Sequence, residues 1–194
     1  MMRITPTLLV LAASLLSAPV AMALNEYGIE GMGVVSTRAD EARGTISADG
    51  QRIVFARRGE GGWGLWQARL IDGRWQQAQA LAVDVSGEAR DPYFSRDGRW
   101  LLFAAGTGGQ LALYRAAVTG DGRLGNAQAL RGERGRYEER GPALSMDGRR
   151  LLFARQQGRG AGWDLFVATL DAEGVRGPAT ALAALNSADD ETDA

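Results

Sequence analysis

The middle of the sequence reads Ser95-Arg96-Asp97-Gly98-Arg99-Trp100-Leu101-Leu102-Phe103-Ala104, and this pattern occurs three times. The other two copies are Ser47-Ala48-Asp49-Gly50-Gln51-Arg52-Ile53-Val54-Phe55-Ala56 and Ser145-Met146-Asp147-Gly148-Arg149-Arg150-Leu151-Leu152-Phe153-Ala154. Successive copies are about 50 residues apart, and self-similarity at one such period is the signature of a repeat architecture. The sequence therefore predicts three structural repeats.

Each copy lies in a longer unit with one order of strand and turn signals. A short strand comes first, and the Asp-Gly pair predicts a tight turn, because Gly adopts positive φ and Asp bonds its own backbone. A second strand of β-branched and aromatic residues ends in Phe-Ala, a Gly-rich loop follows, and a third strand carries a Leu-aromatic pair. A further turn and a weak fourth strand complete the unit. The Leu-aromatic pairs are Leu65-Trp66, Leu113-Tyr114 and Leu165-Phe166.

Four short antiparallel strands in a unit of about 45 to 50 residues are typical of a β-propeller blade. We expect an all-β fold of three such blades with partial flanking strands, which is half or a fragment of a roughly six-bladed propeller. The apolar residues of each second strand must lie between blades, because one four-stranded sheet does not bury both of its faces alone. The expected segments are residues 24–37 for an N-terminal outer strand, 38–85, 86–134 and 135–185 for three blades, and 186–194 for the start of a fourth repeat.

Three blades are fewer than the four to eight or so with which propellers close. Three explanations stay open: the chain is a fragment of a longer propeller, two chains join into one ring, or an open arc has its edges covered by another protein. The last two require self-association or a protein partner to complete the propeller, because unpaired sheet edges and apolar faces promote association.

The first residues predict export. Arg3 forms a short charged region, the stretch Leu8–Leu16 is apolar, and Ala21-Met22-Ala23 is a small-x-small cleavage site. We therefore expect residues 1–23 to be a secretory signal peptide, with an uncleaved anchor as the alternative. The apolar run is shorter than the ~20 residues of a membrane span, so no transmembrane span is expected after signal removal. The predicted location is periplasmic or secreted.

Composition excludes several kinds of chemistry. The chain has no Cys and no His, and every one of its 22 basic residues is Arg. Without these residues a Ser-His-Asp triad, a Cys nucleophile, a usual zinc site and a Schiff-base lysine are all excluded. The formal net charge of −1 gives no footprint for nucleic acid. We expect no catalytic residue, no cofactor, no metal and no nucleic-acid partner, and so a protein that is not an enzyme.

The segments Pro92 to Ala104 and Pro142 to Ala154 carry a further resemblance. With the Leu-aromatic pairs that follow, they resemble the PD40, or WD40-like, repeat of TolB-type exported propellers. The resemblance covers most of residues 38–185 and implies a propeller fold, while the functions found in the family are diverse. Blade 1 departs from the pattern, because Gly44-Thr45 stands where Pro is expected and the entry strand reads as one residue shorter.

Candidate binding residues lie in two sets of loops that open on the same end of the blades. The entry loops combine carboxylates with arginines, and the Gly-rich loops carry Trp and Arg. This candidate binding face comprises Glu41, Arg43, Glu88, Arg90, Asp91, Glu138, Arg140, Arg58, Trp63, Arg159 and Trp163. The ring of charges is able to bind a peptide, a sugar or a cation, whereas local Glu–Arg pairing that orders the blade junctions is the structural alternative.

These patterns favour an exported β-propeller binding or scaffold module for a protein or ligand. The alternative is a carboxylate-based hydrolase, or an accessory propeller domain of an exported enzyme, with Glu41, Glu88 and Glu138 as candidate carboxylates. The repeated Asp49, Asp97 and Asp147 fit a structural role in turns. The acidic tail Asp189–Asp193 is similar to the other blade entries, which favours a structural role over calcium binding.

Overall fold

The computed structural model describes residues 35–132, 137–158 and 161–192. The chain divides into two units, residues 1–30 and 31–194, and the described residues belong to the second. The expected signal peptide, residues 1–23, lies outside the described residues, as does most of the expected outer strand at 24–37. No helix among the described residues is long and apolar enough to cross a membrane.

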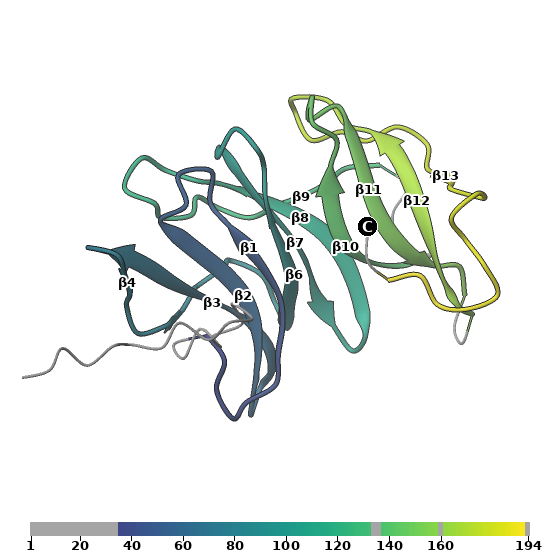
Figure 1. Ribbon diagram of the computed structural model, residues 1–194. Coiled ribbons are helices and arrows are strands. Elements are labelled where there is room, and N and C mark those ends of the chain that lie inside the picture. The colour runs from purple at the N-terminus through teal and green to yellow at the C-terminus, as the bar shows by residue number, and fades with distance from the viewer. Residues whose placement is uncertain (1–34, 133–136, 159–160, 193–194) are drawn as a thin grey trace, which may run out of the picture. The chain divides into compact units, whose positions relative to one another are not determined.

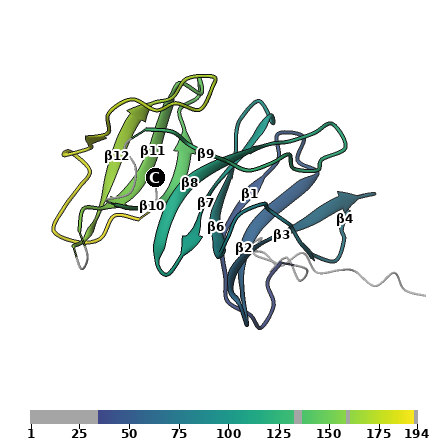
Figure 2. The ribbon, with the colours of Figure 1, turned by 180° about the vertical axis from the view of Figure 1, so that it is seen from behind.

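The described residues form thirteen strands in three antiparallel sheets and no helix, as the sequence predicts. Blade 1 contains β1 (Glu41–Ile46), β2 (Arg52–Gly59), β3 (Gly62–Ile71), β4 (Arg74–Trp75) and β5 (Gln79–Ala80). Blade 2 contains β6 (Glu88–Phe94), β7 (Trp100–Thr107), β8 (Gln110–Ala117) and β9 (Gln128–Ala129). Blade 3 contains β10 (Glu138–Leu144), β11 (Arg150–Gln156), β12 (Trp163–Thr169) and β13 (Thr180–Ala181). Figures 1 and 2 show blade 2 between blades 1 and 3.

The Asp-Gly turns join the first two strands of every blade in the same way. In blade 2, Ser95 Oγ donates to Asp97 Oδ1 at 2.6 Å, and the same oxygen accepts the N–H of Arg99 at 3.0 Å. Gly98 follows with a φ of 70°, a conformation in which glycine carries no Cβ penalty. The other two blades repeat these bonds, so the recurring aspartates serve the turns.

The apolar core lies between the blades. Alternate residues of each second strand face the blade before and the blade after, because side chains alternate across a strand. Leu101 and Phe103 pack with Val54 of blade 1, while Leu102 packs with Leu151 and other residues of blade 3. All five side chains are at most 1% exposed. Each blade is thus stabilised by its neighbours, as the sequence predicts.

The register of β1 corrects the alignment of blade 1. Counted from the Phe-Ala that ends each second strand, Gly44 lies opposite Phe55, and Arg43 is the extra residue of a β-bulge. The other two first strands have their bulges at the same place. The entry strand of blade 1 is therefore not shorter, and Gly44 simply takes the place of the proline.

This register also changes which carboxylates are equivalent. Glu41 lies opposite Arg57, as Glu139 lies opposite Arg155 in blade 3. Glu41 is therefore the counterpart of Glu139 and not of Glu138. The sequence analysis grouped Glu41 with Glu138 because both are glutamates at the start of a blade. A one-residue shift turns a side chain to the other face of the strand, and the sequence does not reveal this shift.

Candidate functional site

The candidate site is built on the bulges of the three first strands. The bulge residues Arg43, Asp91 and Gly141 have φ values of 38°, 54° and 60°. Positive φ is uncommon for residues other than glycine, and such strain often marks functional sites. Arg43 Nε lies 3.7 Å from Asp91 Oδ1, and the Gly141 N–H donates to Asp91 Oδ2 at 3.2 Å. Equivalent positions of three consecutive blades thus meet at one carboxylate.

Asp91 is 1% exposed and faces three guanidinium groups. Besides Arg43, Arg90 Nε and Arg140 Nε lie 3.5 and 3.6 Å from its carboxylate. These separations are longer than ordinary hydrogen bonds, and Asp91 Oδ1, Arg90 Nε and Arg140 Nε have no hydrogen-bond partner within the described part of the chain. Three guanidiniums thus surround one carboxylate at distances beyond direct hydrogen bonding.

Two tryptophans support the arginines. Arg90 Cζ lies 4.9 Å from the ring of Trp63, and Arg140 Cζ lies 5.1 Å from the ring of Trp163. Cation–π attraction holds each guanidinium in place over its ring. The side chains of Arg90 and Arg140 remain 19% and 21% exposed, so solvent reaches them. Arg43, Arg90, Asp91, Arg140, Trp63 and Trp163 are called the arginine cluster below.

Burial and the neighbouring charges of the cluster shift the pKa of Arg43. Burial lowers the pKa of Arg43, the carboxylate of Asp91 opposes this change, and the positive charges of Arg140 and Arg90 add to it. The Arg43 guanidinium also donates to the backbone carbonyl of Thr192. An additional anion beside these arginines lowers their mutual repulsion, so the chemical property of the site is an affinity for negatively charged groups.

Two other residues of the candidate binding face pair locally. Arg57 Nε lies 2.9 Å from Glu41 Oε1, and Arg58 Nη1 lies 3.9 Å from Asp40 on the surface. Burial raises the pKa of Glu41, but hydrogen bonds from Thr37 and Arg57 outweigh it, and the net shift is downward. Glu41 and Arg58 are therefore not part of the arginine cluster. Arg159 lies outside the described residues.

Glu138 and Glu88 form a second feature near the cluster. Burial raises the pKa of Glu138, Arg140 opposes the rise, the charge of Glu88 adds to it, and Arg90 opposes it further. Both glutamates are half-buried at the start of their strands. A carboxyl with a raised pKa beside another carboxylate is the arrangement from which acid–base pairs are made.

The acidic tail reproduces the entry to blade 1. Ser187 N–H and Oγ both donate to Glu191 Oε1, as Thr37 donates to Glu41. The Glu191 N–H also donates to the Trp163 carbonyl at 2.8 Å. No group of three or more potential metal-ligating side chains gathers among the described residues.

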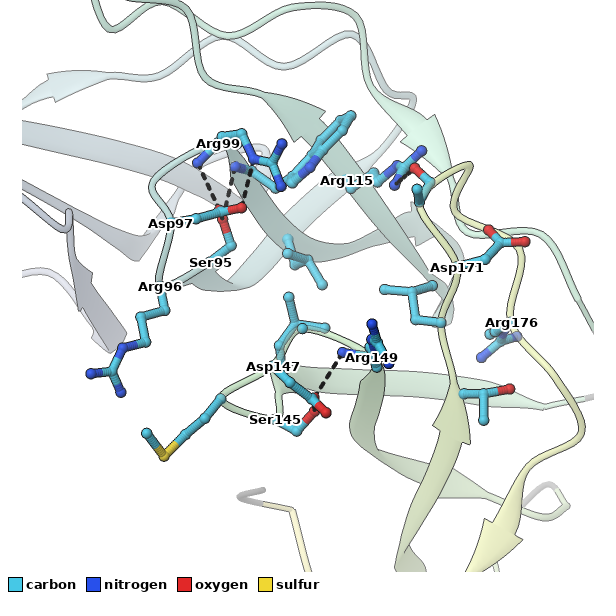
Figure 3. Close-up of a pocket in the computed structure, with 18 of the residues that line it drawn as sticks. Ser95, Arg96, Asp97, Arg99, Arg115, Ser145, Asp147, Arg149, Asp171 and Arg176 are labelled. Carbon is cyan, nitrogen blue, oxygen red and sulfur yellow. Dashed lines mark hydrogen bonds and ion pairs between the residues drawn. The ribbon is translucent and has the colours of Figure 1, made fainter.

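A groove opens at the other end of blades 2 and 3, where the Asp-Gly turns lie (Figure 3). Its volume is about 830 Å³. It is lined by the two turns around Asp97 and Asp147, by Arg115 of β8 and by the loop after β12. The sequence analysis did not identify this groove, because its walls come from segments far apart in the chain. Arg96 and Arg149 also line the groove. The sequence shows them as charged residues of two turns, but it does not show that the two turns lie on one groove.

Comparisons with solved structures identify the fold. A protein of Agrobacterium tumefaciens assigned as TolB matches with a TM-score of 0.58 and 20% identity, over 76% of this chain and 50% of that one. TolB of Acinetobacter baumannii matches with a TM-score of 0.52 and 21% identity, over 72% and 31%. The periplasmic gluconolactonase of Pseudomonas aeruginosa matches with a TM-score of 0.51 and 19% identity, over 72% and 42%.

No family model matches this sequence, and no curated protein matches it. The chain spans between 31% and 50% of the length of the three structures above. At about 20% identity, such matches identify the fold and leave the function open.

The expectation that the chain is not an enzyme is corrected by these comparisons. The gluconolactonase is named for a catalytic activity, and part of its structure resembles the blades of this chain. The absence of His, Cys and Lys excludes particular mechanisms but not the use of carboxylates, Tyr or Arg. The chain therefore has the TolB-type β-propeller fold, a fold that both TolB proteins and an enzyme adopt.

Proposed function

We propose that the chain is an exported β-propeller binding module that holds an acidic group of a protein partner at the arginine cluster. The observation that carries the proposal is the position of three guanidiniums around the single carboxylate of Asp91, with the side chains of Arg90 and Arg140 still 19% and 21% exposed. Guanidinium groups bind carboxylates with charge-assisted hydrogen bonds, which are stronger than neutral ones. The signal-like residues 1–23 support a periplasmic or secreted location.

The test is the binding of a short, labelled, aspartate-rich peptide, followed by fluorescence anisotropy. The Arg140→Gln variant is expected to bind it about tenfold more weakly, because one charge-assisted contact is lost. Arg74→Gln is the matched control, since Arg74 is an exposed residue of β4. Equal affinity of both variants, or equal binding of a peptide with asparagine in place of aspartate, contradicts the proposal.

The flanks of the described blades support a second contact with protein. Ile46 corresponds to Phe94, which is 5% exposed against blade 1, yet Ile46 is 55% exposed. Leu185, after the last strand of blade 3, is 60% exposed. Apolar flanks of this kind favour a partner, or a second copy of the chain, that completes the propeller. Light scattering on residues 24–194 distinguishes a dimer from a monomer.

Hydrolysis by carboxylates is the second candidate function, and the raised pKa of Glu138 beside Glu88 favours it. In that case Glu138 is the acid and Glu88 the base or nucleophile, as in hydrolases that use two carboxylates. Turnover of a panel of chromogenic glycosides and lactones is the measurement. Glu138→Gln and Glu88→Gln should each abolish turnover while Glu41→Gln retains it, and activity that survives all three changes excludes this mechanism.

A further inference from the structure

The groove between blades 2 and 3 is open because the two Asp-Gly turns stand apart. At the junction of blades 1 and 2 the turns lie close together, since a Cβ placed on Gly98 would lie 3.6 Å from Ala48 Cβ. A Cβ placed on Gly148, the equivalent glycine of blade 3, meets nothing within 4 Å. The two junctions therefore differ in how closely their turns pack.

Two long side chains cross the junction between blades 1 and 2. Arg52 and Arg69 face each other at the start of the β2–β3 ladder, and their guanidiniums donate to the carbonyls of Gly122 and Asp121 in blade 2. The matching pair at the next junction, at the start of the β7–β8 ladder, is Trp100 and Ala117. Trp100 and Ala117 thus take the positions of Arg52 and Arg69. The arginines that cross this second junction come from other positions, since Arg115 and Arg131 donate to the carbonyls of Ala172 and Glu173.

The floor of the groove is apolar. Leu102 is 1% exposed, and Trp100, Leu144 and Leu170 pack against the core to which it belongs. These side chains line the groove from both blades. The volume of about 830 Å³ falls in the ~300–1,000 Å³ range of small-molecule sites, which are mostly apolar with a few fixed polar groups.

The walls of the groove carry more arginines than carboxylates. Five arginines and three aspartates line it, and two of the arginines are paired, Arg99 with Asp97 and Arg176 with Glu139. Asp97 and Asp147 accept hydrogen bonds within their own turns, and Asp171 accepts the N–H of Val175 at 2.7 Å, so local bonds occupy these carboxylates. The arginines of the lining are Arg96, Arg99, Arg115, Arg149 and Arg176.

Arg115 holds a fixed positive charge beside the apolar floor. It is 6% exposed, its Cζ lies 4.0 Å from the ring centre of Trp100, and its Nη1 donates to the Ala172 carbonyl at 2.9 Å. Its Nε has no hydrogen-bond partner within the described part of the chain. Arg149 adds an exposed guanidinium from blade 3, across the groove from Arg115 of blade 2 (Figure 3).

We propose that this groove binds a small organic carboxylate with an apolar body. The apolar part lies on the leucines and Trp100, and the carboxylate lies toward Arg149 in the field of Arg115. Such a ligand gains from both features, because apolar burial supplies affinity and the charged end fixes orientation. The site is at the other end of the blades from the arginine cluster and does not depend on it.

The first test is titration of the intact chain with octanoate, followed by calorimetry. Octanoate is expected to bind at least about tenfold more tightly than acetate, which lacks the apolar body, and than octanamide, which lacks the charge. Arg149→Glu should weaken octanoate binding about tenfold or more by placing a carboxylate at the charged end. Arg123→Glu, the same charge change at a side chain 85% exposed and outside the groove, should leave the affinity unchanged.

The second test fills the groove while making it more positive. Thr169 is an exposed residue of β12 that lines the groove, and Thr169→Arg places a long, positively charged side chain there. The proposal expects this variant to lose octanoate binding, with an unchanged circular dichroism spectrum as the check on folding. Tighter binding in Thr169→Arg, equal weakening in Arg149→Glu and Arg123→Glu, or no octanoate binding to the parent chain overturns the proposal.

Discussion

Arg43 and Asp91 occupy the same bulge position in neighbouring blades, and their side chains meet 3.7 Å apart. Asp91 is the carboxylate that lies among the guanidiniums of Arg43, Arg90 and Arg140. Asp91→Asn keeps the shape of the side chain and removes its charge. We expect the free energy of unfolding to fall by about 3 kcal/mol, because the buried charge of Asp91 no longer offsets the repulsion among the three guanidiniums. Urea unfolding at neutral pH measures the change.

The control for this experiment is Asp84→Asn. Asp84 is exposed in the connection between blades 1 and 2, so the same change of charge there should alter stability by less than about 0.5 kcal/mol. Equal stability of the two variants would mean that the carboxylate of Asp91 contributes little to holding the bulges together.

The glycine of the third bulge gives an independent prediction. A Cβ placed on Gly141 would lie 2.9 Å from Arg43 Nη1 and 3.0 Å from the Thr192 carbonyl oxygen, at a φ of 60°. Gly148 has a similar φ of 68° but open space around it. Gly148→Ala should cost about 1 kcal/mol of stability from the backbone alone, and Gly141→Ala clearly more, because it adds a clash. Thermal unfolding of the two variants, side by side, measures the difference; equal losses contradict it.

The repeat made the blades predictable because its signals are local. Asp-Gly turns, strand propensity and the alternation of apolar residues lie within a few residues of one another, so each strand and turn was visible in the sequence. The sequence also predicted a weak fourth strand in each unit, and short strands occur at Gln79–Ala80, Gln128–Ala129 and Thr180–Ala181. Burial of the second strands followed from the inability of one sheet to cover both of its faces.

The site was less predictable because it depends on register and on distant contacts. The sequence analysis selected Arg43, Arg90, Asp91 and Arg140 as parts of a ring of charges. In the structure the three arginines instead surround one buried carboxylate. The sequence analysis also missed Glu139. A shift of one residue decides on which side of a strand a side chain lies, and similarity between the repeats does not reveal such a shift.

Glu139 is the buried counterpart of Glu41, and the two give a matched pair. Glu139 lies 2.8 Å from both Arg155 and Arg176, and all three side chains are at most 5% exposed. Glu41 pairs with Arg57 at 2.9 Å, with side chains 16% and 13% exposed. Glu139→Gln should lower the unfolding free energy by about 3 kcal/mol, and Glu41→Gln by about 1 kcal/mol, because a buried arginine without its partner is the more costly. Urea unfolding of the two variants tests this order; a larger loss in Glu41→Gln contradicts it.

The Asp97 turn predicts a dependence of stability on pH. The hydrogen bond from Ser95 lowers the pKa of Asp97 to about 2, and bonds from Arg99 add to the shift while burial opposes it. A carboxyl whose pKa is lower in the folded state stabilises the fold above its unfolded pKa of about 3.8, and this contribution is lost as the pH falls toward 2. The side chain is 45% exposed, so solvent screening reduces the contribution to about 1 kcal/mol or less.

Asp97→Asn removes this titration and keeps a side chain that fits the turn. The variant should be less stable than the parent chain at pH 7, and the difference should shrink between pH 4 and pH 2, because the parent loses its charged hydrogen bonds there. The measurement is the difference in unfolding free energy between the two proteins, from urea unfolding curves across this pH range. Asp49 and Asp147 also have lowered pKa values from equivalent serine bonds, but they are present in both proteins, so the difference isolates Asp97. A difference that stays constant down to pH 2 means that the charge of Asp97 does not stabilise the turn.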